Sequence, residues 1–185
     1  YTFPPPNKTL CDLVVENNRS CHAIGKIADI FSNRGISTSV SGLSDDALFY
    51  KMIDVIKKAK NGDLIFANFV EFDSLYGHRR DVAGFAAALE RFDLKLVKLL
   101  EIINPNDFLI ITADHGNDPT FKGTDHTREK VPVLMVGNYA QKGNNGNIVF
   151  SDVGATMAAF LNLSWKLKGT NIFNDNNKLE KKCKT

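Results

Sequence analysis

Short apolar runs alternate along the chain with longer stretches in which apolar residues recur at helical spacing. The apolar runs predict strands over residues 20–24, 63–70, 108–112 and 131–136. Apolar positions three and four residues apart predict helices over 7–17, 47–60, 81–103 and 150–163, with a helical turn over 27–31. Strands that alternate with helices favour an α/β fold, with a doubly wound, mostly parallel sheet and helices on both faces.

Local signals add detail to this outline. Ser44, followed by two aspartates, predicts a helix start, and Ser151 with Asp152 behind it predicts another. Residues 63–70 are nearly all apolar, which is typical of a strand buried on both faces. Pro132 lacks an N–H group, so the run that contains it is expected at a sheet edge or at the entry to a strand.

Composition describes an ordinary globular protein. The 185 residues are 43% hydrophobic and 24% charged, with a net charge of +2, which predicts one domain over residues 1–173. Residues 174–185 are polar and lysine-rich, and we expect a disordered tail there. The chain has no dense basic patch interleaved with aromatics, so nucleic acid is a poor candidate partner. No apolar run is long enough to span a membrane.

Three scattered cysteines, Cys11, Cys21 and Cys183, form no Cys-x-x-Cys pair. This usage suits free thiols in a reducing compartment, so we expect a cytoplasmic protein in which the cysteines serve packing or lie on the surface. The first six residues, Tyr1–Pro6, lack a methionine and are rich in proline, which favours a linker or a cut point and a piece of a longer protein.

Histidine and carboxylate side chains cluster directly after the predicted strand 108–112. Asp114-His115 follows that strand, and Asp125-His126 follows a loop that contains Gly123. Ligands bind at strand ends in open α/β sheets, and this side-chain chemistry suits a divalent metal. Adjacent residues on a regular strand point to opposite faces, so Asp114 and His115 share one site only if the strand has ended before them.

A second pair lies beyond the strand 63–70. Asp73 and His78 are five residues apart across a loop that contains Gly77. Alone, the pair would equally suit a turn residue and a satisfied loop histidine. Together with Asp114, His115 and His126, it predicts a metal site supplied by two strand-end loops and one neighbouring loop.

Basic residues flank these ligands, and two interpretations of them stay open. Arg79, Arg80 and Arg128 could contact phosphate or a ligand carboxylate, or they could form salt bridges with nearby acids. Lys26, after the strand 20–24, is a weaker phosphate candidate against the default of a solvated lysine. His22 lies inside that strand without a companion ligand and is interpreted as structural.

The motifs around these residues resemble those of the phosphopentomutase family, which is part of the alkaline phosphatase superfamily of metalloenzymes. The resemblance runs from about Ser20 to Leu163, and its motifs are NFVEFDSLYGHRRD at 68–81, TADHGNDP at 112–119 and GTDHTRE at 123–129. TADHGN alone is shared with cofactor-independent phosphoglycerate mutases. The GHRRD and DHTRE segments point to phosphopentomutase.

The resemblance implies a two-metal site, most often with Mn²⁺, in which Asp73, His78 and His126 hold one ion and Asp114 and His115 bind the other. It implies a mutase of nucleotide metabolism that interconverts ribose or deoxyribose 1-phosphate and the 5-phosphate, with a sugar bisphosphate activator. Paired ions suit such chemistry, because they stabilise the attacking and leaving oxygens together.

The chain departs from the family in one large respect. We find no counterpart of the family's nucleophilic threonine, of a further metal-binding aspartate near the amino terminus, or of the inserted cap domain. The chain therefore looks like the carboxy-terminal part of the catalytic core, and we expect the remainder of the parent protein, or a second chain, to supply the nucleophile. Alone it is expected to be inactive. The alternatives are a phosphoglycerate mutase or related metal-dependent phosphohydrolase, and a non-catalytic fragment.

Overall fold

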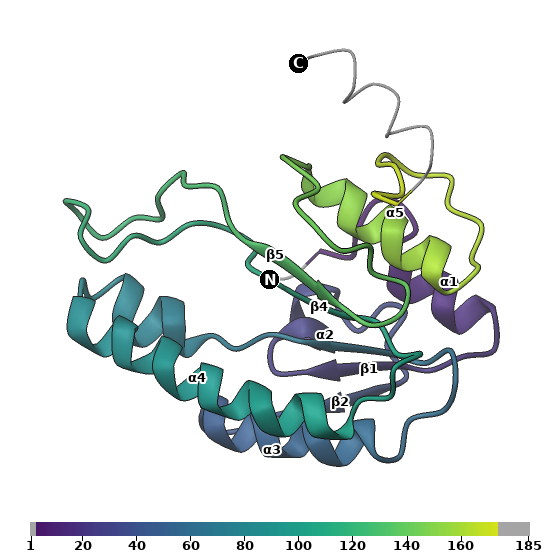
Figure 1. The fold of residues 1–185 in the computed structure, drawn as a ribbon, viewed down its shortest axis with the longest axis horizontal. Helices are drawn as coiled ribbons and strands as arrows, with labels where there is room; N and C mark the ends of the chain where they lie inside the picture. Colours follow the sequence, from purple (N-terminus) through teal and green to yellow (C-terminus); the bar gives the residue numbers. More distant parts are fainter. Residues whose placement is uncertain (1–2, 174–185) are drawn as a thin grey trace. The chain divides into compact units, whose positions relative to one another are not determined.

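The computed structural model describes residues 3–173, so the predicted tail 174–185 and Cys183 lie outside the described residues. The chain divides into two compact units. The first unit comprises Tyr1–Ile103 and Thr112–Val133, and the second comprises Asn104–Ile111 and Leu134–Thr185. Figure 1 shows both units, coloured along the sequence.

The first unit contains a small parallel sheet. Strands β1 (Cys21–Ile24), β2 (Thr38–Val40) and β3 (Leu64–Ala67) run in the order β2-β1-β3, and β1 is parallel to both neighbours. The predictions of strands over 20–24 and 63–70, and of parallel pairing, are confirmed. β2 was not predicted, because its three residues, Thr-Ser-Val, carry almost no apolar pattern.

Helices lie on both sides of this sheet, with α2 (Ile27–Ile30) and α3 (Asp45–Ile56) on opposite faces (Figure 1). Ala23 of β1 packs with Ile27 and Ala28 of α2 in a buried apolar cluster. α1 (Leu10–Glu16) begins with a capping box, in which Thr9 and Asp12 exchange hydrogen bonds. These elements confirm a mixed α/β fold, and the predicted helices over 7–17 and 27–31 are present.

The cysteines of this unit are buried and free. Cys11 in α1 and Cys21 in β1 are each almost completely inaccessible. A hydrogen bond to Cys11 and burial both raise the pKa of the Cys21 thiol, which keeps that thiol protonated and unreactive. Their role is therefore packing, as predicted.

One part of the β3 prediction is wrong. The run 63–70 was expected to be buried on both faces, yet Phe66 is 39% exposed. Its ring contacts Phe31, just beyond α2, at 5.9 Å between centroids. α2 is only four residues long, so it covers too little of this face to bury Phe66 fully.

His22 is structural, in agreement with its interpretation from the sequence. Its Nδ1 lies 2.7 Å from Thr38 Oγ1, and its Nε2 lies 3.3 Å from Asp63 Oδ2. Both ring nitrogens are thus engaged between neighbouring strands.

The long helix α4 (Val82–Ile102) closely matches the prediction for 81–103, and Asp81 caps it by accepting the N–H of Gly84. Before it lies η1 (Phe72–Gly77), a π-helical turn that the sequence pattern did not predict. π-Helical turns occur often at functional sites. α3 begins at the predicted cap, where Ser44 Oγ accepts the N–H of Ala47, but it ends at Ile56, four residues before Lys60.

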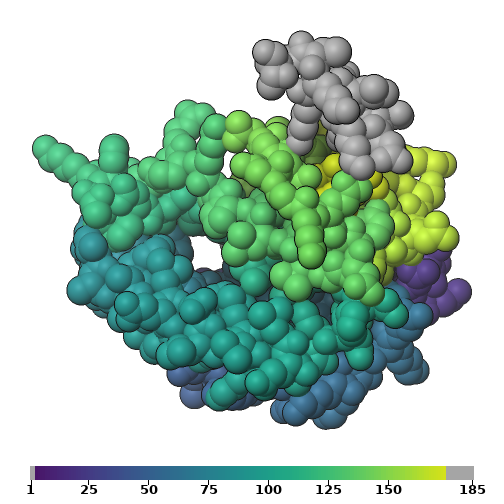
Figure 2. All heavy atoms as spheres, viewed as in Figure 1, coloured from purple at the N-terminus to yellow at the C-terminus, as the bar shows by residue number. Residues whose placement is uncertain are grey.

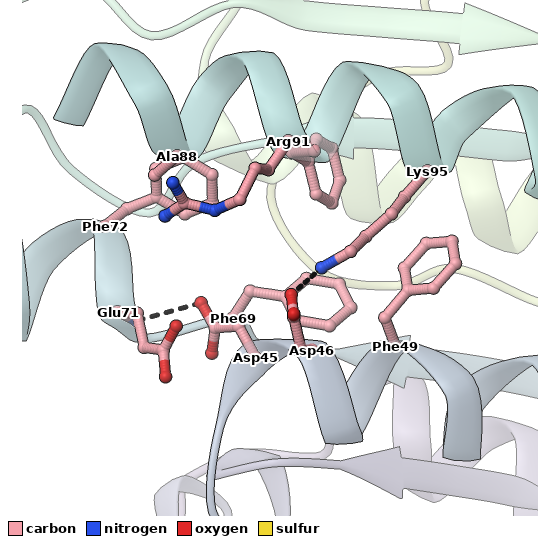
Figure 3. Close-up of a pocket in the computed structure, with 10 residues that line it drawn as sticks. Asp45, Asp46, Phe49, Phe69, Glu71, Phe72, Ala88, Arg91 and Lys95 are labelled. Atoms are coloured by element: carbon pink, nitrogen blue, oxygen red, sulfur yellow. Dashed lines mark hydrogen bonds and ion pairs between the residues drawn. The ribbon is translucent and has the colours of Figure 1, made fainter. Parts of the chain in front are cut away.

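A hollow between α3, α4 and the segment Phe69–Phe72 is lined by acidic, basic and aromatic side chains (Figure 3). Asp45 accepts the backbone N–H groups of Val70 and Glu71, both at 3.0 Å, and so ties the start of α3 to the residues just before η1. Burial raises the pKa of the Asp45 carboxyl, although these two N–H groups bind its charged form. None of the predicted metal ligands lines this hollow.

Most of β4 (Leu109–Thr112) and of β5 (Val133–Val136) lies in the second unit, and the two strands hydrogen-bond to each other, as a pair separate from the first sheet. The predicted strands over 108–112 and 131–136 are therefore present. An aromatic cluster packs beside them, with ring centroids 5.2–6.3 Å apart, and its members are Phe108, Tyr139, Phe160 and Phe173.

Helix α5 (Phe150–Phe160) confirms the helix predicted over 150–163 but corrects its cap. Ser151 was expected to cap it, whereas Val149 occupies the N-cap position. The carboxylate of Asp152 accepts the N–H of Val149 at 3.0 Å. Because the helix begins at Phe150, Ser151 already lies inside the first turn and cannot cap it.

Within residues 3–173, no helix combines the length and the apolar character needed to cross a membrane.

Candidate metal centre

Three imidazoles and one carboxylate gather in the first unit. Asp73 lies in η1 and His78 directly follows that turn, while His115 and His126 lie in the segment after β4. In Figures 1 and 2 this green segment lies beside the blue-teal residues around η1, at the start of α4. The four side chains therefore come from two parts of the chain that are distant in sequence.

Their ligand atoms are close together. Nε2 of His78 lies 3.3 Å from Asp73 Oδ2, and Nε2 of His126 lies 3.3 Å from Asp73 Oδ1. The two Nε2 atoms are 3.1 Å apart. One ligand atom each from Asp73, His115 and His126 also lie within 4.8 Å of one another.

These separations fit a shared divalent ion. Nitrogen and oxygen ligands that bind one ion at about 2.0–2.2 Å lie about 2.8–3.6 Å apart in tetrahedral or octahedral geometry. The pairwise distances of 3.1–3.3 Å among Asp73, His78 and His126 fall in this range. Facing imidazole nitrogens at this distance need a proton or a cation between them.

The hydrogen bonds of the His78 and His115 imidazoles involve Nδ1 and leave Nε2 free to bind a metal ion. His78 Nδ1 donates to the carbonyl oxygen of Thr124, and His115 Nδ1 donates to that of Gly116 at 3.2 Å. With Nδ1 protonated, Nε2 of each neutral ring keeps its lone pair. Such an outer hydrogen bond is the usual way in which proteins fix the tautomer of a metal-binding histidine.

An isolated antiparallel bridge brings His115 and His126 together. Gly116 pairs with Thr127, whose N–H donates to the Gly116 carbonyl oxygen at 3.0 Å. The hydroxyl of Thr127 accepts the N–H of Asp118 at 2.7 Å. The neighbouring imidazoles stack at 3.8 Å with 22° between the rings. The strand has ended at Thr112, as the shared role of Asp114 and His115 requires.

Asp114 lies at the edge of this group. Its side chain is 72% exposed, and its Oδ1 is 3.7 Å from His115 Nε2. The structure thus brings Asp114 beside His115 but leaves it facing solvent.

Of the basic residues, the structure separates Arg80 from the others. Lys26, Arg79 and Arg128 are exposed, whereas Arg80 is half-buried and donates to Asn117 Oδ1 and to backbone carbonyls. Its hydrogen bonds link the end of η1 to the segment after β4. Hydrogen bonds from the side chain and backbone of Thr120 lower the pKa of the nearby Asp118.

Asn117 is a residue of this site that the sequence interpretation missed. Its Nδ2 donates to Asp73 Oδ1 at 2.6 Å. The only signal was its place two residues after His115, and nothing local shows that it reaches η1.

A profile of the Metalloenzyme superfamily matches residues 18–165. The chain belongs to this superfamily, and its fold and histidine cluster agree with that membership. Within the superfamily, it is similar to phosphopentomutases, which confirms the resemblance seen in its motifs. It is 49% identical to the phosphopentomutase of Legionella pneumophila (strain Corby) over 165 residues, which cover 89% of this chain and 40% of that protein.

Other bacterial relatives agree. The phosphopentomutase of Chelativorans sp. (strain BNC1) is 48% identical over 175 residues, covering 94% of this chain and 43% of that protein. The phosphopentomutase of Sinorhizobium medicae (strain WSM419) is 49% identical over 164 residues, covering 88% and 40%. The chain therefore spans about 40% of the length of these relatives.

The PH0037 protein from Pyrococcus horikoshii has a similar structure. Its TM-score is 0.64 at 17% sequence identity, and the match covers 84% of this chain and 53% of that one. At this identity the likeness supports the fold alone.

Proposed function

We propose that this chain is part of a phosphopentomutase, a phosphomutase that interconverts pentose 1-phosphates and 5-phosphates at a two-metal site. The observation that carries the proposal is the convergence of Asp73, His78 and His126 within 3.1–3.3 Å. It occurs in a chain 49% identical to a phosphopentomutase. The same proposal takes residues 1–173 as part of one doubly wound core domain.

The proposed ligand sets follow the resemblance to phosphopentomutases. Asp73, His78 and His126 would hold one ion, and Asp114 and His115 would contribute to a second. One ligand atom each of Asp73, His115 and His126 lies within 4.8 Å of the others, so an ion bound by His115 would lie close to Asp73 and His126. When bound, two Mn²⁺ ions would stabilise the attacking and leaving oxygens of an in-line phosphoryl transfer.

The protein's own residues would position the metal ions and the substrate and would provide neutral nitrogen ligands. His78 and His115 hold their Nε2 lone pairs toward the site through hydrogen bonds at Nδ1. Lys26, Arg79 and Arg128 are exposed cations available to a substrate phosphate. We assign the nucleophilic threonine and a further metal-binding aspartate to the remainder of the parent protein or to a second chain.

The proposal also includes the cellular compartment of the enzyme. The buried, free thiols of Cys11 and Cys21 suit a reducing environment, and we place the enzyme in the cytoplasm, in nucleotide metabolism.

Activity is tested with the intact protein, ribose 1-phosphate, Mn²⁺ and a sugar bisphosphate activator. We expect ribose 5-phosphate to form, and its absence under these conditions would contradict the proposal. Turnover of phosphoglycerate, or phosphate release that exceeds isomerisation, would favour the related mutase or phosphohydrolase instead. The 185-residue chain alone should show no turnover.

The ligand assignment is tested separately by calorimetric titration with Mn²⁺. We expect His78→Ala to weaken binding strongly, since it removes a ligand atom. The matched control His22→Gln removes an imidazole from the sheet and should leave Mn²⁺ binding unchanged. Equal binding by the wild type and His78→Ala would refute the assignment.

A further inference from the structure

The guanidinium of Arg80 lies within hydrogen-bond distance of five oxygen atoms, which belong to three segments of the first unit. It donates to the carbonyl oxygens of Gly77 and Asp118 at 3.0 Å each. It also donates to Asn117 Oδ1 and to the Asp125 carbonyl oxygen at 2.6 Å each, and to the carbonyl oxygen of Gly123.

Two of the five acceptors directly precede a proposed metal ligand, and two more connect to one through a further hydrogen bond. Gly77 precedes His78, and Asp125 precedes His126. Asn117, which accepts from Arg80 through Oδ1, donates to Asp73 through Nδ2. Gly123 adjoins Thr124, whose carbonyl oxygen fixes the tautomer of His78. One side chain thus connects the segments that carry Asp73, His78 and His126.

The backbone of Arg80 supports a specific role. Its φ is +54°, in the left-handed region that residues with a Cβ seldom adopt. Arg80 lies between η1 and α4, and from there its guanidinium reaches the loop after β4. This network of hydrogen bonds, in which the two N–H groups of Nη1 are shared among three acceptors, compensates for the unfavourable backbone.

Electrostatic attraction explains only part of this placement. After the hydrogen bonds of Thr120, the positive charge of Arg80 also contributes to the lowered pKa of Asp118, but its hydrogen bonds go to neutral carbonyl and amide oxygens, and a guanidinium near a divalent cation is repelled by it. We propose that Arg80 is a positioning residue, which sets the separation of the ligand atoms of Asp73, His78 and His126. This inference rests on the proposed metal site.

Arg80 could affect Mn²⁺ binding as a positive charge or as a positioning residue, and the two roles predict opposite changes in Mn²⁺ affinity when Arg80 is replaced. If the residue acts mainly as a nearby positive charge, its removal strengthens Mn²⁺ binding. If it positions the ligands, its removal weakens binding, by about 10- to 100-fold as for other groups that orient metal ligands. The sign of the change therefore decides between them.

The experiment is calorimetric titration of the intact protein with Mn²⁺, for wild type, Arg80→Ala, Arg80→Lys and Lys122→Ala. Lys122 is exposed in the neighbouring loop, so its replacement removes one positive charge without touching the network. We expect both Arg80 variants to bind at least about tenfold more weakly, since lysine keeps the charge but not the fork of donors. Lys122→Ala should bind as the wild type does, or slightly more tightly.

Other outcomes overturn the inference. Tighter binding by Arg80→Ala, or unchanged binding by Arg80→Lys, would show that Arg80 acts as a charge alone. A wild type that binds no Mn²⁺ would also overturn it. If Arg80→Ala fails to fold, Arg80→Lys still decides, with circular dichroism to confirm its fold.

Failure of the proposed function is distinguishable from failure of this inference. If the wild type binds Mn²⁺ but isomerises no pentose phosphate, the mutase assignment is wrong. The role of Arg80 is then still tested by the Mn²⁺ affinities of its variants. As a second readout, guanidinium ion added to Arg80→Ala should restore part of the lost Mn²⁺ affinity, whereas a matched concentration of ammonium ion should not. Equal effects of the two ions would contradict a positioning role.

Discussion

The side-chain amide of Asn117 donates to Oδ1 of Asp73 at 2.6 Å, across 44 residues of sequence. The opposite end of the same amide accepts from Arg80 at 2.6 Å, so both ends of Asn117 are fixed. The carboxylate of Asp73 is therefore oriented before any ion binds. This contact relates the segment after β4 to the π-helical turn before α4.

Asn117→Ala should weaken Mn²⁺ binding by about 10- to 100-fold, because Asp73 would lose the donor that orients it. The measurement is calorimetric titration of the intact protein. Asn138→Ala is the matched control, since it removes an exposed amide whose partner is Asn106 in the second unit. Unchanged affinity in Asn117→Ala would contradict the orienting role.

Gly77→Ala should weaken Mn²⁺ binding through the same contact. A Cβ at this position would lie 2.4 Å from Nδ2 of Asn117 and 3.0 Å from the carbonyl oxygen of Phe72. Asn117 would have to move away from Asp73, with the loss of affinity expected for Asn117→Ala.

The double variant Gly77→Ala/Asn117→Ala tests this explanation. Because both changes disrupt one contact, the double variant should bind Mn²⁺ about as well as Asn117→Ala alone. If the fold losses of Mn²⁺ affinity in the two single variants multiply in the double variant, Gly77 affects binding independently of Asn117.

Much of the fold could be predicted from the sequence, because its helices and strands carry local patterns. α4 was predicted almost to its ends, since its apolar period persists over 21 residues. β2 was missed because three residues of mixed polarity carry no period, and η1 because a π-helical turn depends on tertiary contacts. The cap of α5 was misplaced by two residues, since Asp152 reaches the N–H of Val149.

The candidate site shows a similar division. Asp73, His78, His115 and His126 were found from their residue types and their places after strands, and the structure brings them together. Arg80 and Asn117 were not assigned their roles, because most of their partners lie 37 to 45 residues away. No pattern within a segment reports hydrogen bonds of that span.

Asp63→Asn should lower the free energy of unfolding at neutral pH by about 1–3 kcal/mol. Asp63 accepts the N–H groups of Ser20 and Lys60 at 2.9 and 2.8 Å, and its side chain is only 6% exposed. Burial acts to raise the pKa of Asp63, but these hydrogen bonds and His22 together lower it.

The pH dependence of this effect has a definite sign. A carboxyl whose pKa is lowered on folding stabilises the protein above its unfolded pKa of about 3.9, and this contribution is lost as the pH falls through the lower folded value. The difference between wild type and Asp63→Asn in chemical denaturation should therefore shrink below about pH 4. Asp54→Asn, an exposed change on α3, should show little difference at any pH. A difference for Asp63→Asn that does not vary with pH would be evidence against this role.

Thr156→Val should destabilise the second unit by about 1–3 kcal/mol. The hydroxyl of Thr156 is fully buried, donates to the carbonyl oxygen of Asp152 at 2.7 Å and accepts the N–H of Ile172 at 2.9 Å. Valine keeps the shape but leaves the buried N–H of Ile172 without its partner.

Thr156→Ser is the matched control, because it keeps the hydroxyl and removes one methyl group, at about 0.8 kcal/mol. Chemical denaturation should therefore find the serine variant more stable than the valine variant. The reverse order would mean that methyl packing outweighs the hydrogen bonds.

His78 and His126 lie 48 residues apart in the chain, with the whole of α4 and the crossing into the second unit between them. An ion shared by their Nε2 atoms would close a long covalent loop, as a disulfide does, and would lower the entropy of every state in which the segment 113–132 detaches. Metal binding would then slow amide hydrogen exchange along that whole segment, including residues that do not bind the ion. The centre would act as a reversible cross-link of the first unit as well as a place for chemistry.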